Sequence, residues 1–120
     1  MLLTSYDDDR LGWYHRNGCV RDWNNAGQVQ ASELCGLADF NEGRIGYRNY
    51  IKDAMRLWLD KGVDAFRVDT VKHMPIWFWQ EFVTDILTEY PDIFIFGEWF
   101  LGGANDPNSI RFANNSGMSM

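Results

Sequence analysis

Two acidic residues, Asp69 and Glu98, each follow a short stretch of apolar, strand-forming residues. The first stretch covers 63–69 and ends in the acid itself, whereas the second covers 93–96 and is followed by Gly97 and the acid. Functional residues of parallel α/β proteins lie at the carboxyl ends of the strands. Two carboxylates at such an edge can act as a nucleophile and as a general acid or base. Acids at strand ends also cap helices or pair with surface lysines, so the spacing alone leaves a structural role open.

The distance between neighbouring strands limits how far apart the two carboxylates can lie. Paired strands run ~4.8 Å apart, so carboxyl groups on adjacent strands can approach the ~5–5.5 Å at which a retaining glycosidase holds its nucleophile and its acid/base. Arg67 projects from the same face of the strand as Asp69, and its guanidinium favours the ionised form of that carboxylate. Two carboxylates ~5 Å apart repel by ~3 kcal/mol at an effective dielectric of ~20, so one of them keeps its proton near neutral pH. We therefore predict that Asp69 is the ionised nucleophile and that Glu98 is the protonated acid/base.

Two amphipathic patterns predict the helices that position these strands. The first begins at Tyr47 and ends before Lys61 and Gly62, which form a stop signal. Its apolar residues recur at helical spacing and are Tyr47, Tyr50, Ile51, Ala54, Met55 and Trp58. The second begins at Pro75, and its apolar residues are Trp79, Phe82, Val83, Ile86 and Tyr90. The order helix, strand, helix, strand with short connections predicts an α/β fold with a parallel sheet and right-handed crossovers.

Residues 1–44 lack sustained periodicity and are rich in Gly, Asn and Asp, which favour turns. An irregular stretch of this length is more often a functional loop or a small inserted domain than a linker. Trp23, in this stretch, is the best candidate among the six tryptophans for stacking on a ligand. Trp58 and Trp79 belong to the helical apolar stripes and are expected in the core. Towards the other end of the chain, 114–117 has the composition of a turn.

The composition limits the partners that the chain can bind. Its formal net charge of −6 argues against nucleic acid, which is bound through clustered Lys and Arg. No apolar run reaches the length of a membrane span, and the first residues lack the basic start and the apolar stretch of a signal peptide. Cys19 and Cys35 lie in the same loop-rich region, where they can form a disulfide in an exported protein or remain two free thiols.

Three segments of the chain resemble signature segments of glycoside hydrolase family 13, the α-amylase family. Its calcium-side segment, before the third barrel helix, resembles residues 36–41, which read GLADFN. Its nucleophile segment resembles residues 62–74, which read GVDAFRVDTVKHM, and its acid/base segment resembles residues 96–100, which read FGEWF. The three segments occur in the order of the family. Residues 112–119 add a resemblance to cyclodextrin glucanotransferases and related bacterial α-amylases within that family.

The resemblance implies a fold and a set of catalytic residues. The fold is a partial (β/α)8 TIM barrel over 45–120, comprising helix 3, strand 4, helix 4 and strand 5, with part of the inserted B domain over 1–44. Asp69 matches the nucleophile of the family and Glu98 matches its acid/base. Arg67 matches the residue that keeps the nucleophile ionised.

Further positions match the substrate and metal contacts of the family. Lys72, His73 and Phe100 match residues that contact glucose units on the leaving-group side, although Phe100 also suits ordinary packing at a barrel rim. Asp39 matches a ligand of Ca²⁺, with Gln30 and His73 at positions that supply main-chain oxygens. Because calcium takes oxygen ligands, His73 would use its carbonyl and not its imidazole. The alternative for Asp39 is an acid that caps the following helix.

We therefore expect a fragment of a retaining enzyme that hydrolyses the α-1,4-glucosidic bonds of starch and maltodextrins by double displacement. The resemblance places the family's first segment before Met1 and its third catalytic acid after Met120. Cys35 stands where cyclising transferases carry a central aromatic residue, which favours a hydrolase over a cyclodextrin glucanotransferase-type transglycosylase. An extracellular or periplasmic location is suspected from the family.

Two other classes of protein remain as alternatives. The tryptophan content and the acidity would suit a non-catalytic carbohydrate-binding module, but such modules are usually rich in strands, whereas this sequence alternates helices and strands. A metal-dependent barrel enzyme would use Asp69, His73 and Glu98 as ligands of zinc or manganese.

Overall fold

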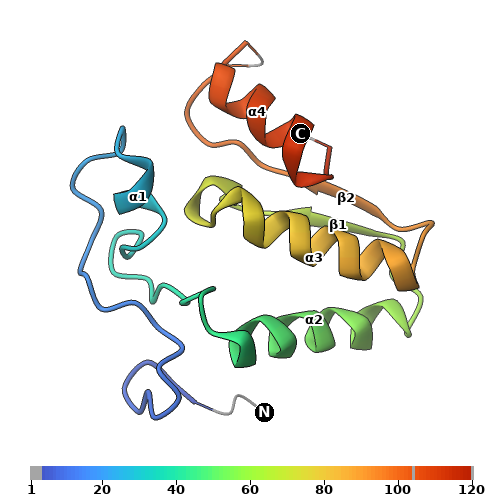
Figure 1. The fold of residues 1–120 in the computed structure, drawn as a ribbon, viewed down its shortest axis with the longest axis horizontal. Helices are drawn as coiled ribbons and strands as arrows, with labels where there is room; N and C mark the ends of the chain where they lie inside the picture. The colour runs from blue at the N-terminus through green and yellow to red at the C-terminus, as the bar shows by residue number, and fades with distance from the viewer. Residues whose placement is uncertain (1–3, 104, 120) are drawn as a thin grey trace. The chain divides into compact units, whose positions relative to one another are not determined.

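A computed structural model describes residues 4–103 and 105–119 of the chain (Figure 1). The chain divides into two compact units, Met1–Ile51 (unit 1) and Lys52–Met120 (unit 2). Helix α2 (Ile45–Leu59) crosses the boundary between them as one continuous element. Among the described residues, no helix is both long and apolar enough to cross a membrane.

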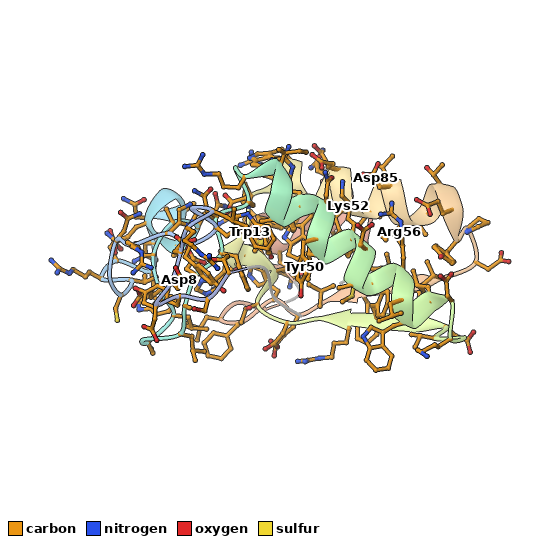
Figure 2. The ribbon with its side chains drawn as sticks, turned by 90° about the horizontal axis from the view of Figure 1, so that it is seen from below. Asp8, Trp13, Tyr50, Lys52, Arg56 and Asp85 are labelled. Atoms are coloured by element: carbon orange, nitrogen blue, oxygen red, sulfur yellow. The ribbon has the colours of Figure 1, made fainter. Side chains whose placement is uncertain are left out.

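Unit 1 is held together by aromatic packing around an irregular backbone, as its composition predicts. Tyr14 and Phe40 form a single antiparallel bridge, and their rings stack with centroids 4.7 Å apart. The Phe40 ring also stacks on Tyr47, with centroids 4.6 Å apart. The Trp13 ring lies against the Tyr50 ring, with centroids 5.4 Å apart (Figure 2). These rings bury the beginning of α2 against the loops that precede it.

A short helix interrupts the loops of unit 1. Helix α1 (Ala26–Val29) begins after Asn25, whose side chain accepts a hydrogen bond from the Gln28 N–H. An Asn at this position satisfies one of the N–H groups that a helix leaves unpaired at its start. The helix ends at Gln30, whose N–H donates to the Ala26 carbonyl.

Unit 2 contains the parallel strand pair that the sequence predicts. Strand β1 (Ala65–Val68) leads through the short 3-10 helix η1 (Val71–His73) into α3 (Ile76–Glu89), and α3 leads into strand β2 (Phe94–Gly97). Figure 1 shows α3 running alongside the two strands. The register pairs Ala65 with Phe94, Phe66 with Ile95, Arg67 with Phe96 and Val68 with Gly97. The predicted parallel βαβ arrangement is therefore confirmed.

The apolar stripe predicted for α3 is the buried face of that helix. Its buried residues are Phe78, Trp79, Phe82, Val83 and Ile86. The Trp79 indole N–H donates to the carbonyl of Val71, which is itself fully buried. The prediction that Trp79 lies in the core is confirmed. Tyr90 caps the end of α3 and lies outside the helix.

The predicted face of α2 is partly wrong. Trp58 is 53% exposed, so its assignment to the core does not hold in this structure. Lys52 and Arg56, four positions apart on α2, instead donate hydrogen bonds to acids of α3, and Leu59 is buried. Figure 2 shows Lys52 and Arg56 projecting from α2, with Asp85 of α3 close to Lys52. Lysine and arginine can bury their alkyl chains when acids on a neighbouring helix pair with their charged groups. This face of α2 therefore does not appear in the sequence as an apolar stripe.

The turn predicted at 114–117 is mostly helical. Helix α4 (Pro107–Ser116) contains its first three residues, and only Gly117 lies beyond the helix, with φ of 82°. The start of α4 carries a clear signal, because Asp106 caps it and Pro107 occupies the first helical position. After the helix, Ser119 bridges to Phe96 of β2, so the chain returns to the edge of β2 that does not pair with β1.

Candidate active site

Asp69 and Glu98 follow the last paired residues of two adjacent parallel strands. Val68 pairs with Gly97, and the Glu98 N–H donates to the Val68 carbonyl at 2.8 Å. The two acids therefore stand side by side at the carboxyl ends of β1 and β2. The prediction that they come from adjacent parallel strands is confirmed.

One guanidinium contacts both carboxylates. Arg67 Nη1 lies 3.2 Å from Asp69 Oδ1, and Arg67 Nη2 lies 3.1 Å from Glu98 Oε1. The sequence predicts that Arg67 favours Asp69 in particular, whereas the structure shares the guanidinium between the two acids. The planar fork of arginine carries several N–H groups in a fixed geometry, which suits it to hold two oxygens at once. Arg67 therefore contacts both acids at once.

The backbone turns sharply after Asp69. Thr70 adopts a left-handed conformation, with φ of 49° and ψ of 44°, which costs a residue with a Cβ about 1 kcal/mol. The turn leads into η1, and the Val71 N–H lies 3.4 Å from the Glu98 carbonyl. Strain of this kind is concentrated at functional sites, where the surrounding structure holds it in place. Here the hydrogen bond from Val71 joins the segment after Asp69 to the backbone of Glu98.

Three further predicted site residues lie near the same strand ends. The Lys72 ammonium donates to the Phe100 carbonyl, and it lies 5.4 Å from the Trp99 ring centroid and 5.9 Å from that of Phe100. The Phe100 side chain is 54% exposed. His73 follows Lys72 in η1. Unit 2 thus brings together the predicted residues Arg67, Asp69, Lys72, His73, Glu98 and Phe100.

Two residues near the site were not identified from the sequence. The Trp99 indole N–H donates to Asp106 Oδ2 at 3.1 Å, and the Trp99 ring lies 4.9 Å from the Phe112 ring of α4. The signal for Asp106 was present in the sequence, since an Asp before a Pro is typical of a helix start. The hydrogen bond between Trp99 and Asp106 could not be predicted from the sequence, because it depends on the path of the loop between the two residues.

The predicted metal ligand Asp39 lies in unit 1 beside a histidine that the sequence did not single out. His15 Nδ1 lies 2.7 Å from Asp39 Oδ2, and the Asp39 side chain is only 10% exposed. Burial raises the pKa of Asp39 to about 6, although the hydrogen bond from His15 opposes this shift. Glu42 is also buried, which raises the pKa of its carboxyl, and its Oε2 has no hydrogen-bond partner among the described residues.

These oxygens have the chemistry that calcium requires, but they do not form a complete site on their own. A hard cation would offset the cost of burying the Asp39 and Glu42 carboxylates. Among the described residues, no group of three His, Cys, Asp or Glu side chains is arranged to hold a metal ion. Gln30 lies in unit 1 with Asp39, whereas His73 belongs to unit 2. Calcium binding by Asp39 with main-chain oxygens of Gln30 and His73 stays a prediction.

The remaining predicted residues of unit 1 lie in turns. Trp23 is 38% exposed. Cys35 has a left-handed φ of 49° and precedes Gly36, with φ of 83°, in a turn closed by the Leu37 N–H and the Leu34 carbonyl. Of the two alternatives for Cys19 and Cys35, the structure has the free thiols, both of them exposed.

The chain matches known proteins over most of its length. Residues 22–119 match the family model described as "Alpha amylase, catalytic domain". A cyclomaltodextrin glucanotransferase and an α-amylase from Niallia circulans are each 43% identical over 120 residues, or 99% of this chain. The chain spans only 16% of the first relative's length and 22% of the second's.

Solved structures give the same picture. The cyclomaltodextrin glucanotransferase CldA, described as having a three-domain ABC distribution, matches with a TM-score of 0.91 and 37% identity. That match covers 98% of this chain and 24% of the other. An α-amylase from Geobacillus thermoleovorans, solved in complex with acarbose, matches with a TM-score of 0.79 and 29% identity, covering 89% and 24% of the two chains.

Proposed function

This chain belongs to the α-amylase family, and we propose that the whole enzyme hydrolyses α-1,4-glucosidic bonds of starch and maltodextrins with retention of configuration. The observation that carries the proposal is the placement of Asp69 and Glu98 on adjacent strand ends, in contact with the same guanidinium. Retaining enzymes need two carboxyl groups close together, because one of them must reach the sugar carbon directly.

The reaction follows from two roles for the two acids. An Asp69 oxygen attacks the anomeric carbon while Glu98 donates its proton to the leaving glucosidic oxygen, so that one C–O bond forms as the other breaks. Glu98, now ionised, then removes a proton from water. The resulting hydroxide equivalent attacks the same carbon and releases Asp69 as a free carboxylate. Arg67 stabilises the charge that passes between the two acids.

Substrate binding is proposed for residues around the strand ends and for one residue in unit 1. The exposed ring of Phe100 offers a face for stacking on a glucose unit, and Lys72 and His73 offer hydrogen-bond donors on the leaving-group side. Arg67 is proposed to act on the bound sugar indirectly, because it holds the two acids that contact the sugar. Trp23 is proposed as a further stacking surface.

Calcium is proposed as a structural cofactor. Asp39 would supply a carboxylate oxygen, and the carbonyls of Gln30 and His73 would supply further oxygens. The support is the buried Asp39 carboxylate, together with the unpartnered Oε2 of the nearby acid Glu42. A bound Ca²⁺ would make this charge favourable and would order the surrounding loops.

The segment is proposed to be one part of a (β/α)8 barrel. In this assignment α2 is helix 3, β1 is strand 4, α3 is helix 4 and β2 is strand 5, and unit 1 is part of the inserted B domain. The support is the match to structures of the family over nearly the whole chain. Functional residues of such barrels lie at the carboxyl ends of the strands, which agrees with the positions of Asp69 and Glu98.

A cyclodextrin glucanotransferase-type activity is the second candidate. Its support is the number of similar relatives that carry that name, including relatives from Niallia circulans and Klebsiella oxytoca. Both activities share the first step and differ in whether water or a sugar hydroxyl takes up the glycosyl unit. Incubation with maltodextrin separates them, because hydrolysis yields linear reducing ends whereas cyclisation yields none.

The proposed nucleophile is tested by replacing Asp69 in the whole enzyme. Asp69→Asn keeps the shape of the side chain and loses the nucleophilic oxygen, so turnover should fall below detection while glucan binding persists. Asp64→Asn is the matched control, since Asp64 precedes β1 at the other end of the strand and its side chain is exposed. Near-normal turnover by Asp69→Asn would remove Asp69 from the mechanism. The anomer of the first product, followed by NMR, tests retention independently.

A further inference from the structure

Trp99, the residue after Glu98, packs against α4. The Glu98 side chain contacts Arg67, whereas the ring of Trp99 lies against Phe112 of α4 with centroids 4.9 Å apart. Glu98 and Trp99 are consecutive in the chain and share a peptide unit, so contacts that fix the backbone at Trp99 also limit the direction of the Glu98 side chain. The orientation of Glu98 thus depends on what holds Trp99.

Asp106 holds Trp99 and the start of α4 with the same carboxylate. Its Oδ2 accepts the Trp99 indole N–H at 3.1 Å, and its Oδ1 accepts the Asn108 N–H at 2.8 Å. The Asn108 hydrogen bond, followed by the Trp99 hydrogen bond, lowers the pKa of Asp106. Asp106 is therefore ionised near neutral pH, and its charge favours both hydrogen bonds.

Lys72 reaches Trp99 from the segment that follows the other acid. Its ammonium lies 5.4 Å from the Trp99 ring centroid and donates to the Phe100 carbonyl. An ammonium at this distance from an indole is attracted to the ring. Trp99 is consequently held by contacts from two segments of unit 2, namely η1 through Lys72 and helix α4 through its cap Asp106 and its residue Phe112.

Gly102 lies close to the Trp99–Asp106 hydrogen bond. Gly102 has φ of 131°, a conformation that residues with a side chain rarely adopt. A Cβ built on Gly102 would collide with the Asp106 carboxylate and would lie 3.1 Å from Trp99 Nε1. The loop thus has the one residue type that leaves the Trp99–Asp106 bond intact.

We propose that Asp106 is a positioning residue for Glu98, which it orients through the hydrogen bond to Trp99. The proposal rests on the proposed role of Glu98 as the general acid. Asp106 does not touch the substrate. It fixes the backbone next to Glu98, so that the carboxyl group meets the leaving oxygen at hydrogen-bonding distance.

The test compares two leaving groups in the whole enzyme. A glucan leaving group is a poor one and needs the proton from Glu98, whereas the phenolate of an activated aryl maltooligoside leaves without it. Asp106→Ser keeps a good helix cap but is too short to reach Trp99, and Trp99→Phe keeps an aromatic ring but loses the N–H. Each variant should lower kcat/KM on maltooligosaccharides about tenfold, the scale of one hydrogen bond to a charged group. The kcat/KM on the aryl substrate should change little, because its first step needs no proton from Glu98.

Glu98→Gln separates the failure of this proposal from the failure of the proposed function. The comparison uses kcat/KM, which reports the first step, because Glu98 also acts as the base in the second step with either substrate. If Glu98→Gln lowers kcat/KM equally on both leaving groups, Glu98 is not the general acid and the proposed function itself fails. If Glu98→Gln lowers kcat/KM on the glucan alone, but Asp106→Ser and Trp99→Phe lower it on both leaving groups equally or on neither, the positioning role of Asp106 is wrong. The double variant Asp106→Ser with Trp99→Phe should be no slower than either single variant, because each substitution removes the same hydrogen bond. An additive loss would also overturn the proposal.

Discussion

Asp69 and Glu98 are joined through a single guanidinium, with Arg67 Nη1 at 3.2 Å from one carboxylate and Nη2 at 3.1 Å from the other. The three side chains are partly exposed, at 53% for Arg67, 65% for Asp69 and 36% for Glu98. Because solvent weakens such ion pairs, the geometric constraint matters more than the contribution to stability. A guanidinium that contacts both carboxyl groups also favours keeping the two groups close together.

Replacing Arg67 by Lys tests this shared contact. Lysine keeps the charge but presents a single ammonium instead of a planar fork, so it cannot hold both carboxylates in the same way. We expect Arg67→Lys in the whole enzyme to lower kcat/KM on maltodextrin by at least about tenfold, since one charged hydrogen bond is lost. The melting temperature should change little.

The control for Arg67→Lys is Arg111→Lys on the exposed surface of α4. That variant should keep the activity of the unmodified enzyme. If Arg67→Lys were equally active, the charge alone would explain the role of Arg67 and the two-pronged contact would have no catalytic importance.

A buried lysine links α2 to α3. Lys52 is 6% exposed, and its Nζ lies 2.9 Å from Glu81 Oε1 and 2.6 Å from Asp85 Oδ2. Burial lowers the pKa of Lys52, but the hydrogen bonds that Lys52 donates to Asp85 and Glu81 outweigh it, so the net shift is upward. A raised pKa in the folded state means that this stabilisation is present at neutral pH. It is lost only as the pH rises above the ordinary lysine value of 10.5.

Lys52→Met should destabilise unit 2 by about 1–3 kcal/mol, because it leaves two acids facing each other without a cation. Urea unfolding of the whole enzyme at pH 7 measures the loss. Lys61→Met is the matched control at an exposed position and should be neutral. Adding Glu81→Gln and Asp85→Asn to Lys52→Met should restore part of the stability. No loss in Lys52→Met would mean that the helices are held by apolar contacts alone.

Much of the fold follows from sequence pattern, but the faces of the helices do not. The spacing of apolar residues predicts both long helices and the parallel strands, since those elements bury their apolar side chains. It fails for Trp58, which is 53% exposed, and for the face of α2 that carries Lys52 and Arg56. That face is buried by acids of α3, and no local pattern in α2 reports which charges another helix supplies.

Part of the candidate site could likewise be predicted from the sequence and part could not. The positions of Asp69 and Glu98 could be predicted, because an acid at the end of each of two adjacent strands must lie at the same sheet edge. The sharing of Arg67 and the bond between Trp99 and Asp106 could not be predicted. Both depend on side-chain directions and on a loop path that three-dimensional packing decides.

Removal of calcium should destabilise the protein if Asp39 binds it. A ligand that binds only the folded state stabilises it by about 2.7 kcal/mol at one hundred times its Kd. The melting temperature of the whole enzyme should therefore fall after treatment with a chelator and recover with added Ca²⁺. Asp39→Asn should abolish that response, whereas Asp7→Asn, at an exposed position in the same unit, should keep it. A chelator response that survives in Asp39→Asn would place the metal elsewhere.

The chain made alone, as residues 1–120, should be inactive and only marginally stable. β1 pairs with β2 on one side, and no strand among the described residues pairs with its other edge. Large apolar side chains are left in water, including Phe94 and Trp58 at 53% exposure each. Unpaired edges and exposed apolar patches favour aggregation and offset the stability of a small core. Thermal unfolding followed by circular dichroism should show a broad transition, and a starch assay should show no hydrolysis with or without calcium. A sharp cooperative transition, together with measurable starch hydrolysis by this chain, would show that it folds and functions without further segments.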